Sequence, residues 1–252
     1  MIDALRSEWI KLRTILMNWI LLTIAVAFPP IVCILTTALQ DKDDVTSENV
    51  VSLVSGTSVV TALLLGVIGA TSITGEFGFG TIRPTFAACP RRHTVVLAKA
   101  IMTAFVAVIA ETIVVVVTFI ACSLIASGRD VPISVDDVPA GVAPLIGVIV
   151  FAGLVALLGY GLGLIIRNTP AAVAVLLVWP LVIEGLVASL LGAIGVEHPV
   201  KYMPYNAGIQ LGNPDAASSP ELLSRVTAGV YFGSVTALVV VIGAVLTSRR
   251  DA

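Results

Sequence analysis

The chain has 252 residues, of which 58% are hydrophobic and only 12% are charged, and its mean hydropathy is +1.05. Soluble domains carry about a quarter charged residues, so this composition excludes an ordinary soluble protein and predicts an integral membrane protein. The formal net charge of −2 indicates no basic surface for nucleic acid, and we expect no nucleic-acid partner.

Residues 1–16 have the pattern of an amphipathic helix. Arg6, Lys11 and Arg13 disfavour immersion in hydrocarbon, so we expect this helix to lie in the headgroup layer with Trp9 at the interface. The alternative is that it only extends the first membrane span. Its apolar residues recur at steps of three and four and share one face, opposite Lys11: Ile2, Leu5, Trp9, Leu12 and Leu16.

Apolar runs long enough to cross a bilayer predict an all-α membrane protein, because barrel strands would alternate in much shorter segments. Pro180 is expected to kink the fifth run, and residues 196–225 are expected to form an external segment of short helices and turns. The six predicted spans are residues 18–39, 50–72, 95–126, 142–166, 171–195 and 226–247.

The distribution of basic residues predicts the orientation of the chain. Six spans place both termini on one side, and basic residues concentrate on the cytoplasmic side of membrane proteins. Ten of the 14 lie on the side of the termini, which we therefore expect to be cytoplasmic, and four lie on the other: Lys42, Arg129, Lys201 and Arg225.

The segment between the second and third spans is polar, glycine-rich and net basic, and it is too long for a tight turn. Glycines and a proline bracket residues 81–88, a run that could form one or two turns of helix, with Pro84 tolerated in the first turn. We interpret residues 78–92 as a coupling segment, a short cytoplasmic helix on which a soluble motor subunit docks.

Two acidic residues, Glu111 and Glu184, fall inside predicted spans. An ionisable group in hydrocarbon is expensive, so each is a candidate functional residue, and each can equally be a buried structural carboxyl group. The glycines of the fourth span, among them Gly159 and Gly163, are interpreted as sites of close helix contact.

Motifs for chemistry are missing from the sequence. No lysine follows a glycine, so there is no phosphate-binding loop of the Walker A type, and there is no zinc-protease or serine-elbow motif. The two histidines have no paired ligands nearby and the three cysteines lie far apart, so we expect neither a metal site nor a disulfide. The chain is therefore predicted not to be an enzyme.

Two stretches carry a resemblance to the ABC-2-type permeases, the membrane subunits of ABC exporters. The first, residues 7–14, is similar to the Glu-x-x-Lys-x-Arg pattern of the family's N-terminal helix, through Glu8, Trp9, Lys11 and Arg13. The second resembles the family's coupling segment, although Pro84 is unusual there and can alter the start of the helix. Its matching residues are Glu76, Phe77, Gly80, Thr81, Ile82, Arg83, Thr85, Pro90 and Arg92.

The resemblance implies a permease in the bacterial cytoplasmic membrane, in contact with lipid, that pairs with a second copy or a paralogue. It also implies separate ABC ATP-binding subunits that dock on the coupling segment, with ATP and Mg²⁺ on those subunits and no cofactor in this chain. The second and fifth spans of the two copies would line the substrate pathway. Projected onto this sequence, the pathway residues are Thr57, Ser58, Thr61, Trp179 and Glu184.

Three other functions stay open on sequence alone. A secondary transporter could use Glu111 and Glu184 to carry protons, and it would need no ATPase. A membrane enzyme is disfavoured by the missing motifs. A membrane scaffold or sensor would leave the polar segment after the second span without a transport role.

Overall fold

The structure is a computed structural model, and it describes residues 2–81, 92–138, 140–214 and 222–250. These described residues form helices and no strand, and six helical segments are long and apolar enough to cross a membrane. The prediction of an all-α membrane protein is therefore confirmed. The predicted coupling helix falls largely on residues 82–91, which lie outside the described residues.

The described residues form a shorter N-terminal helix, five continuous long helices and one divided helix. Helix α1 (Ile2–Thr14) precedes α2 (Leu16–Leu39), α3 (Ser47–Gly78), α5 (Arg92–Ser127) and α6 (Ala143–Ile166), and α10 (Arg225–Arg250) ends the described chain. The fifth candidate span consists of α7 (Thr169–Val178), a π-helical turn η3 (Trp179–Ile183) and α8 (Glu184–Ala193). The remaining elements are one-to-two-turn helices: η1 (Lys42–Asp44), η2 (Val135–Asp137), η4 (Pro199–Tyr202), α9 (Pro204–Ile209) and η5 (Gln210–Gly212).

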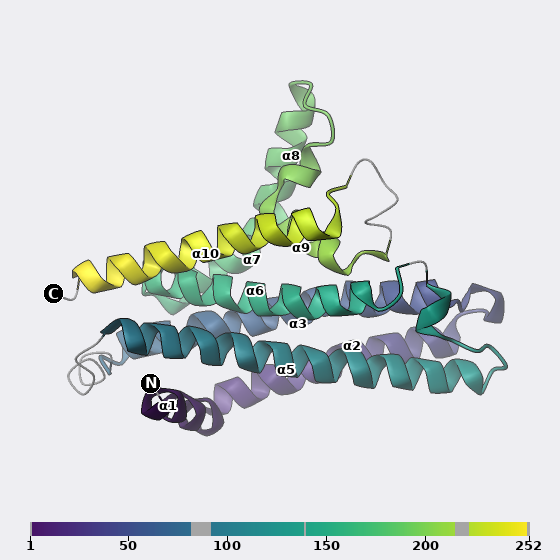
Figure 1. Cartoon of the computed structure of the whole chain (residues 1–252), viewed down its shortest axis with the longest axis horizontal. Coiled ribbons are helices and arrows are strands. Elements are labelled where there is room, and N and C mark those ends of the chain that lie inside the picture. Colours follow the sequence, from purple (N-terminus) through teal and green to yellow (C-terminus); the bar gives the residue numbers. More distant parts are fainter. Residues whose placement is uncertain (1, 82–91, 139, 215–221, 251–252) are drawn as a thin grey trace.

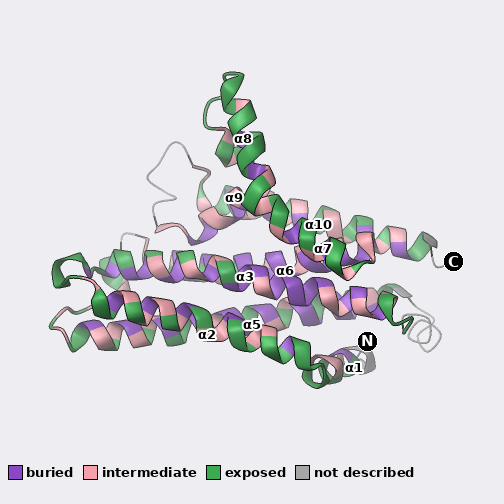
Figure 2. Ribbon diagram, turned by 180° about the vertical axis from the view of Figure 1, so that it is seen from behind, coloured by how far each residue is buried: buried purple, intermediate pink, exposed green. Residues whose placement is uncertain are grey.

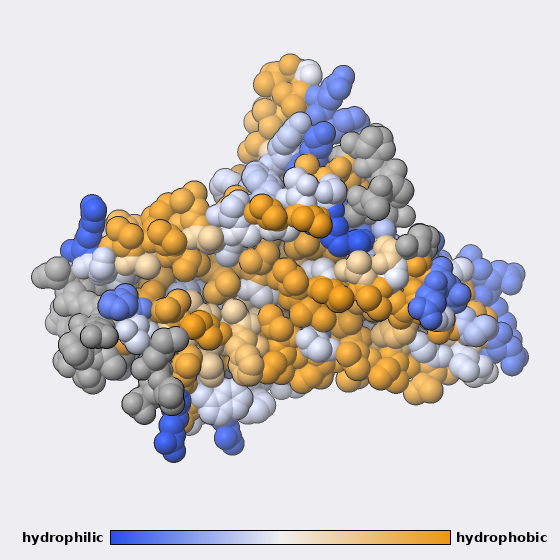
Figure 3. All heavy atoms as spheres, in the orientation of Figure 1, coloured by the Kyte–Doolittle hydropathy of each residue, from blue (hydrophilic) through white to orange (hydrophobic). Residues whose placement is uncertain are grey.

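The long helices run side by side, with α3 and α6 at the centre and both ends of the chain at the same end of the bundle (Figure 1). Buried residues concentrate on α3 and α6 in Figure 2. In their most apolar stretches 50% and 56% of residues are buried, against 17% in α10. Hydrophobic side chains cover the middle of the bundle and hydrophilic ones gather towards its two ends (Figure 3). This distribution suits a multi-pass membrane protein whose outer helices face lipid.

Glycines bring α3 and α6 into backbone contact. A Cβ atom added at Gly159 would lie 2.0 Å from the carbonyl oxygen of Gly66, and one added at Gly69 would lie 2.2 Å from the carbonyl oxygen of Ala156. No side chain fits in either place. The interpretation of the fourth-span glycines as sites of close helix contact is therefore confirmed. In lipid the hydrophobic effect does not drive helices together, and small residues allow the close packing that does.

The fifth span does not follow the bundle. At the π-helical turn that contains Pro180 the helix changes direction, and α8 projects sideways from the other helices (Figures 1 and 2). The ring of Pro180 removes one backbone donor and clashes with the preceding turn, which accounts for a bend at this point. The kink predicted at Pro180 is confirmed, but its size was not foreseen.

The segment after α8 folds back against the bundle. Tyr205 of α9 packs between Phe151 of α6 and Phe232 of α10, with ring centroids 5.2 and 6.0 Å away. The guanidinium group of Arg225 donates hydrogen bonds to the carbonyl oxygens of Leu211 and Asn213, at 3.1 and 2.8 Å. The short helices expected in residues 196–225 are present, and they are held by an aromatic cluster rather than by polar contacts alone.

The contact between α3 and α6 leads to a first prediction. Gly159→Ala puts a methyl group into the backbone of α3, and overpacking of this kind costs about 1–3 kcal/mol of unfolding free energy. Gly56→Ala, on α3 where the added atom meets nothing within 4 Å, is the matched control and is expected to be neutral or stabilising by about 0.5–1 kcal/mol. Thermal unfolding of the detergent-purified variants measures both, and equal melting temperatures would contradict the prediction.

Candidate functional site

Four charged side chains from three helices form one buried cluster at the end of the bundle that holds α1 (hereafter the ion cluster: Glu8, Lys11, Glu76 and Lys99). The Nζ atom of Lys11 lies 2.9 Å from Oε1 of Glu8 and 2.5 Å from Oε1 of Glu76. The Nζ atom of Lys99 forms ion pairs with both acids, at 3.1 Å to Oε1 of Glu76. The two lysines and two glutamates thus pair crosswise and their charges cancel.

The sequence positions explain how the ion cluster forms. Glu8 and Lys11 are three residues apart, so they lie on the same face of α1. Glu76 lies in the last turn of α3, and Lys99 lies two turns into α5 and is only 2% exposed. Lys99 also donates a hydrogen bond to the carbonyl oxygen of Ser72, at 3.2 Å. A buried lysine needs such partners, because an unpaired charge costs several kcal/mol to bury.

Lys11 is the most exposed member of the cluster, with about a third of its side chain open to solvent. Partial burial by itself would lower its pKa, but the hydrogen bonds to Glu76 and Glu8 raise the pKa above its ordinary value of 10.5. The charged form is therefore favoured by folding, and its stabilising contribution is complete below that ordinary value. It is lost as the pH rises through the raised pKa.

The ion cluster borders the predicted coupling segment on both sides. Helix α3 ends at Gly78, and Gly80 adopts a left-handed conformation with φ of 68°, which glycine allows without strain. Helix α5 begins at Arg92, seven residues before Lys99. Residues 82–91 connect α3 to α5, and the ion cluster joins α1 to both of these helices.

Further contacts fasten the same end of the bundle. The guanidinium carbon of Arg167 lies 4.5 Å from the ring centroid of Phe77, a cation–π geometry. The hydroxyl group of Tyr160 donates to the carbonyl oxygen of Val96 at 2.9 Å and so joins α6 to α5. These contacts join α6 and the residue that follows it to α3 and α5 at this end of the bundle.

The structure describes only part of the predicted coupling segment. Glu76 and Phe77 lie in the last turn of α3, where Glu76 belongs to the ion cluster, and Gly80 and Thr81 lie in the turn that follows. Arg92 is the first residue of α5. The other predicted coupling residues lie outside the described residues: Ile82, Arg83, Thr85 and Pro90.

The predicted helix at the N-terminus is present. The sequence pattern put Lys11 opposite the apolar face and named no partner for it, and the structure directs Lys11 and Glu8 into the ion cluster. Glu8 is only 6% exposed, while Trp9 is 45% exposed and Arg13 is also exposed. The partners of Glu8 and Lys11 lie far along the chain on α3 and α5, so the local sequence pattern of α1 does not reveal these ion pairs.

The predicted pathway residues on α3 mostly serve helix contacts. The hydroxyl group of Thr61 is buried and donates to the carbonyl oxygen of Ala25 on α2 at 3.1 Å. Thr57 donates to its own helix, to the carbonyl oxygen of Leu53 at 2.8 Å. Ser58 is buried beside Glu111 of α5, and neither carboxyl oxygen of Glu111 reaches hydrogen-bond geometry with a described group.

Trp179 and Glu184 lie elsewhere, in a pocket of about 270 Å³ that none of the three α3 residues lines. Glu184 is 1% exposed, and its carboxylate accepts hydrogen bonds from the backbone N–H groups of Tyr205 and Asn206 at 2.7 and 3.0 Å. The Asn206 amide and the Trp179 indole also donate to it, at 2.8 and 3.1 Å. Glu184 therefore caps the first turn of α9 and fixes it to the bent fifth span.

Most of the chain matches one protein family. Residues 4–196 match a family model described as ABC-2 family transporter protein. The chain belongs to the ABC-2 transporter family. No curated protein matches it in a sequence search.

As an ABC-2 family protein the chain is a membrane component with a permease role in an ABC transporter, and members of the family associate with ABC ATP-binding subunits. The matched range contains Glu8, Lys11, Glu76 and Lys99, so the whole ion cluster lies within the matched region. The resemblance found at residues 7–14 and 76–92 is confirmed at the level of the family.

Lys99 is the member of the ion cluster that sequence reasoning missed. It was counted only as a charge that sets orientation, although it is the one basic residue inside a predicted span. A lysine in an apolar run must find an acidic partner or reach the interface, and this signal could have pointed to Glu8 or Glu76.

The ion cluster leads to a second prediction. Lys99→Met leaves two buried carboxylates with Lys11 alone, and removing one partner of a buried ion pair costs about 3–5 kcal/mol of unfolding free energy. Lys42→Met is the matched control, because Lys42 is largely exposed and its ion pair is expected to contribute about 0–1 kcal/mol. The double change Glu8→Gln with Lys99→Met restores the charge balance and should recover part of the loss. Thermal unfolding measures all three, and a Lys99→Met variant as stable as Lys42→Met would refute the cluster's role.

A third prediction concerns Glu184. Glu184→Ala leaves buried donors of Tyr205 and Asn206 unsatisfied, at about 1–3 kcal/mol for each unsatisfied group. We expect a lower melting temperature and faster proteolysis within residues 199–214, where α9 lies. Glu197→Ala, at an exposed acid in the same segment, should change neither. Unchanged proteolysis in Glu184→Ala would show that α9 does not depend on this carboxylate.

Proposed function

We propose that this ABC-2 family protein is the permease subunit of an ATP-driven exporter, that it acts as a dimer, and that each copy docks a separate ATPase subunit on residues 78–92. The observation that carries this proposal is the ion cluster, which joins α1, α3 and α5 at the two points where the coupling segment begins and ends.

The cluster suits the transmission of movement. A short docking element moves a membrane domain only if its two ends are anchored in a unit that moves as one body. Here the ends are α3 and α5, and Lys99 bridges them through Glu76 while Glu8 adds α1. When the ATPase subunits close on ATP, the force on the coupling segment would reach α1, α3 and α5 together rather than bend one helix.

The orientation rests on the distribution of charge. The ten basic residues on the side of the termini favour a cytoplasmic location for this end, where ATP is available. The sequence holds no phosphate-binding loop, so ATP and Mg²⁺ belong to the partner subunit. The expected location is therefore the bacterial cytoplasmic membrane, with both termini inside.

A second copy of the chain, or a paralogue, is the proposed partner within the membrane. Helix α8 projects from the bundle and exposes large apolar side chains, among them Leu186 and Leu190, at 58% and 68% exposure. Two copies facing each other through α3 and the fifth span would place the pathway between them, lined by residues such as Thr57 and Trp179. A proton-coupled mechanism through Glu111 and Glu184 is not favoured, because Glu184 is already engaged by four donors.

The proposed docking of an ATPase leads to a fourth prediction. Arg83→Glu reverses a charge in the coupling segment. Losing a paired interfacial charge costs about 2–5 kcal/mol, which weakens the affinity by a factor of about tens to thousands. The variant should insert and purify normally, yet fail to retain the ATPase subunit or to transport. Co-purification of the two chains at matched expression measures this.

Arg249→Glu is the control, because it makes the same charge reversal at an exposed site near the end of α10, outside the coupling segment. It should retain the ATPase. Full retention of the ATPase and normal transport by Arg83→Glu would overturn the proposed docking point.

A further inference from the structure

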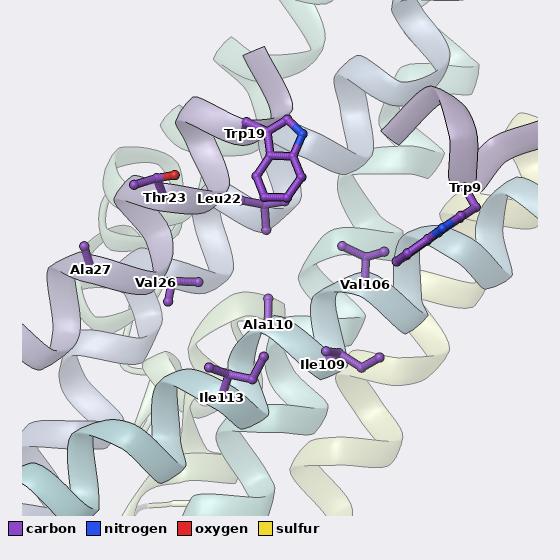
Figure 4. A pocket seen from close by; sticks show the side chains of 10 residues that line it. All are labelled: Trp9, Trp19, Leu22, Thr23, Val26, Ala27, Val106, Ile109, Ala110 and Ile113. Carbon is purple, nitrogen blue, oxygen red and sulfur yellow. The ribbon is translucent and has the colours of Figure 1, made fainter. Parts of the chain in front are cut away.

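An apolar groove runs between α1, α2 and α5 at the outer surface of the bundle. It has a volume of about 500 Å³, and Trp9 of α1 and Trp19 of α2 border it together with Val26, Ile109 and Ile113 (Figure 4). The Trp19 indole N–H is already satisfied by the carbonyl oxygen of Arg13, at 2.9 Å. The interior of the groove is therefore suited to a hydrocarbon chain rather than to a polar ligand.

The length of the groove fits one leaflet of a bilayer. Its lining on α2 extends from Trp19 to Ala27. The eight steps between these two residues cover about 12 Å, at about 1.5 Å rise per residue. One leaflet contributes about 15 Å of hydrocarbon, half of the roughly 30 Å core. The two tryptophans lie at the end nearest α1, where indole rings are expected at headgroup level. A lipid acyl chain could lie along the groove with its headgroup beside α1.

The face of α1 that carries Trp9 is positively charged. Arg6 and Arg13 lie seven residues apart, which is two turns of helix, and Trp9 lies between them on the same side. Both arginines are exposed, and neither forms an ion pair with a residue whose side chain the structure describes. Guanidinium groups bind phosphate through two parallel hydrogen bonds, so this face complements a phosphate headgroup.

We propose that the groove binds an anionic phospholipid, with one acyl chain against Trp9, Trp19 and Ile109 and the phosphate on Arg6 and Arg13. The ion cluster holds the opposite face of α1, since Glu8 and Lys11 point towards α3 and α5. The lipid would thus hold α1 from its other side, next to the extended residue Ile15 that connects α1 to α2. The proposal rests on the membrane location of the chain and not on docking of an ATPase.

Intrinsic tryptophan fluorescence tests this site directly. The sequence has three tryptophans, so Trp179→Phe leaves Trp9 and Trp19 as the only two, both in the groove. The purified variant in detergent micelles is titrated with phosphatidylglycerol or phosphatidylcholine that carries brominated acyl chains, which quench indoles on contact. We expect saturable quenching, with the anionic lipid bound at least about tenfold more tightly. If Trp179→Phe is unstable, the difference between the parent chain and Trp9→Phe/Trp19→Phe gives the same reading.

Three variants locate the binding. Arg6→Gln/Arg13→Gln should abolish the preference for the anionic lipid, whereas Arg249→Gln/Arg250→Gln removes the same charge elsewhere and should keep it. Ala27→Phe, a partly exposed lining position, should fill the groove and weaken quenching by both lipids. These variants leave the four residues of the ion cluster unchanged.

Several results would overturn the proposal. Equal quenching by the two lipids would mean that the arginines recognise no anionic headgroup. Quenching unaffected by Arg6→Gln/Arg13→Gln or by Ala27→Phe would place the lipid elsewhere. Quenching that occurs in the monomer and disappears in the dimer would show that a second copy of the chain covers the groove.

Discussion

The crosswise pairing of Glu8, Lys11, Glu76 and Lys99 is the interaction on which this end of the molecule depends. Each lysine pairs with both acids, so Glu8, Glu76 and Lys99 can be buried at the boundary of an apolar bundle without an unpaired charge. The pairing also fixes α1 against α3 and α5, because an amphipathic helix by itself would be free to move and turn within the plane of the membrane surface. If an ATPase subunit docks at residues 82–91, as we propose, this joint would carry its force into α1, α3 and α5.

Close contact between α3 and α6 complements the ion cluster. Gly66, Gly69 and Gly159 let the two backbones touch, so the pair forms a stiff centre around which α2, α5 and α10 are arranged. Since α3 carries Glu76 at its end, movement of the cluster must displace this centre as well. Charge pairing at one end and close helix contact along the middle therefore favour motion of the domain as a rigid body.

The bent fifth span is the span that leaves the bundle. Helix α8 lies apart from the bundle, and Glu184 links it to α9 through four hydrogen bonds. The capping role of Glu184 explains why an acidic residue lies within an apolar segment, and this explanation needs no proton pathway. The exposed apolar side chains of α8 would suit contact with another protein surface. The groove beside α1 would suit a lipid chain.

The sequence by itself determined the class of the protein, the number of spans, the contact role of the fourth-span glycines and the family, because apolar run length, small-residue spacing and the motifs around Glu8 and Glu76 are local signals. Only the tertiary structure decided that Lys99 pairs with Glu8, 91 residues away, and that Glu184 caps α9, 21 residues further on. It also decided the direction of α8, since a proline predicts a bend but not where the next helix goes. The packing of the helices determines which residues pair with a buried charge, and local sequence periodicity does not contain that information.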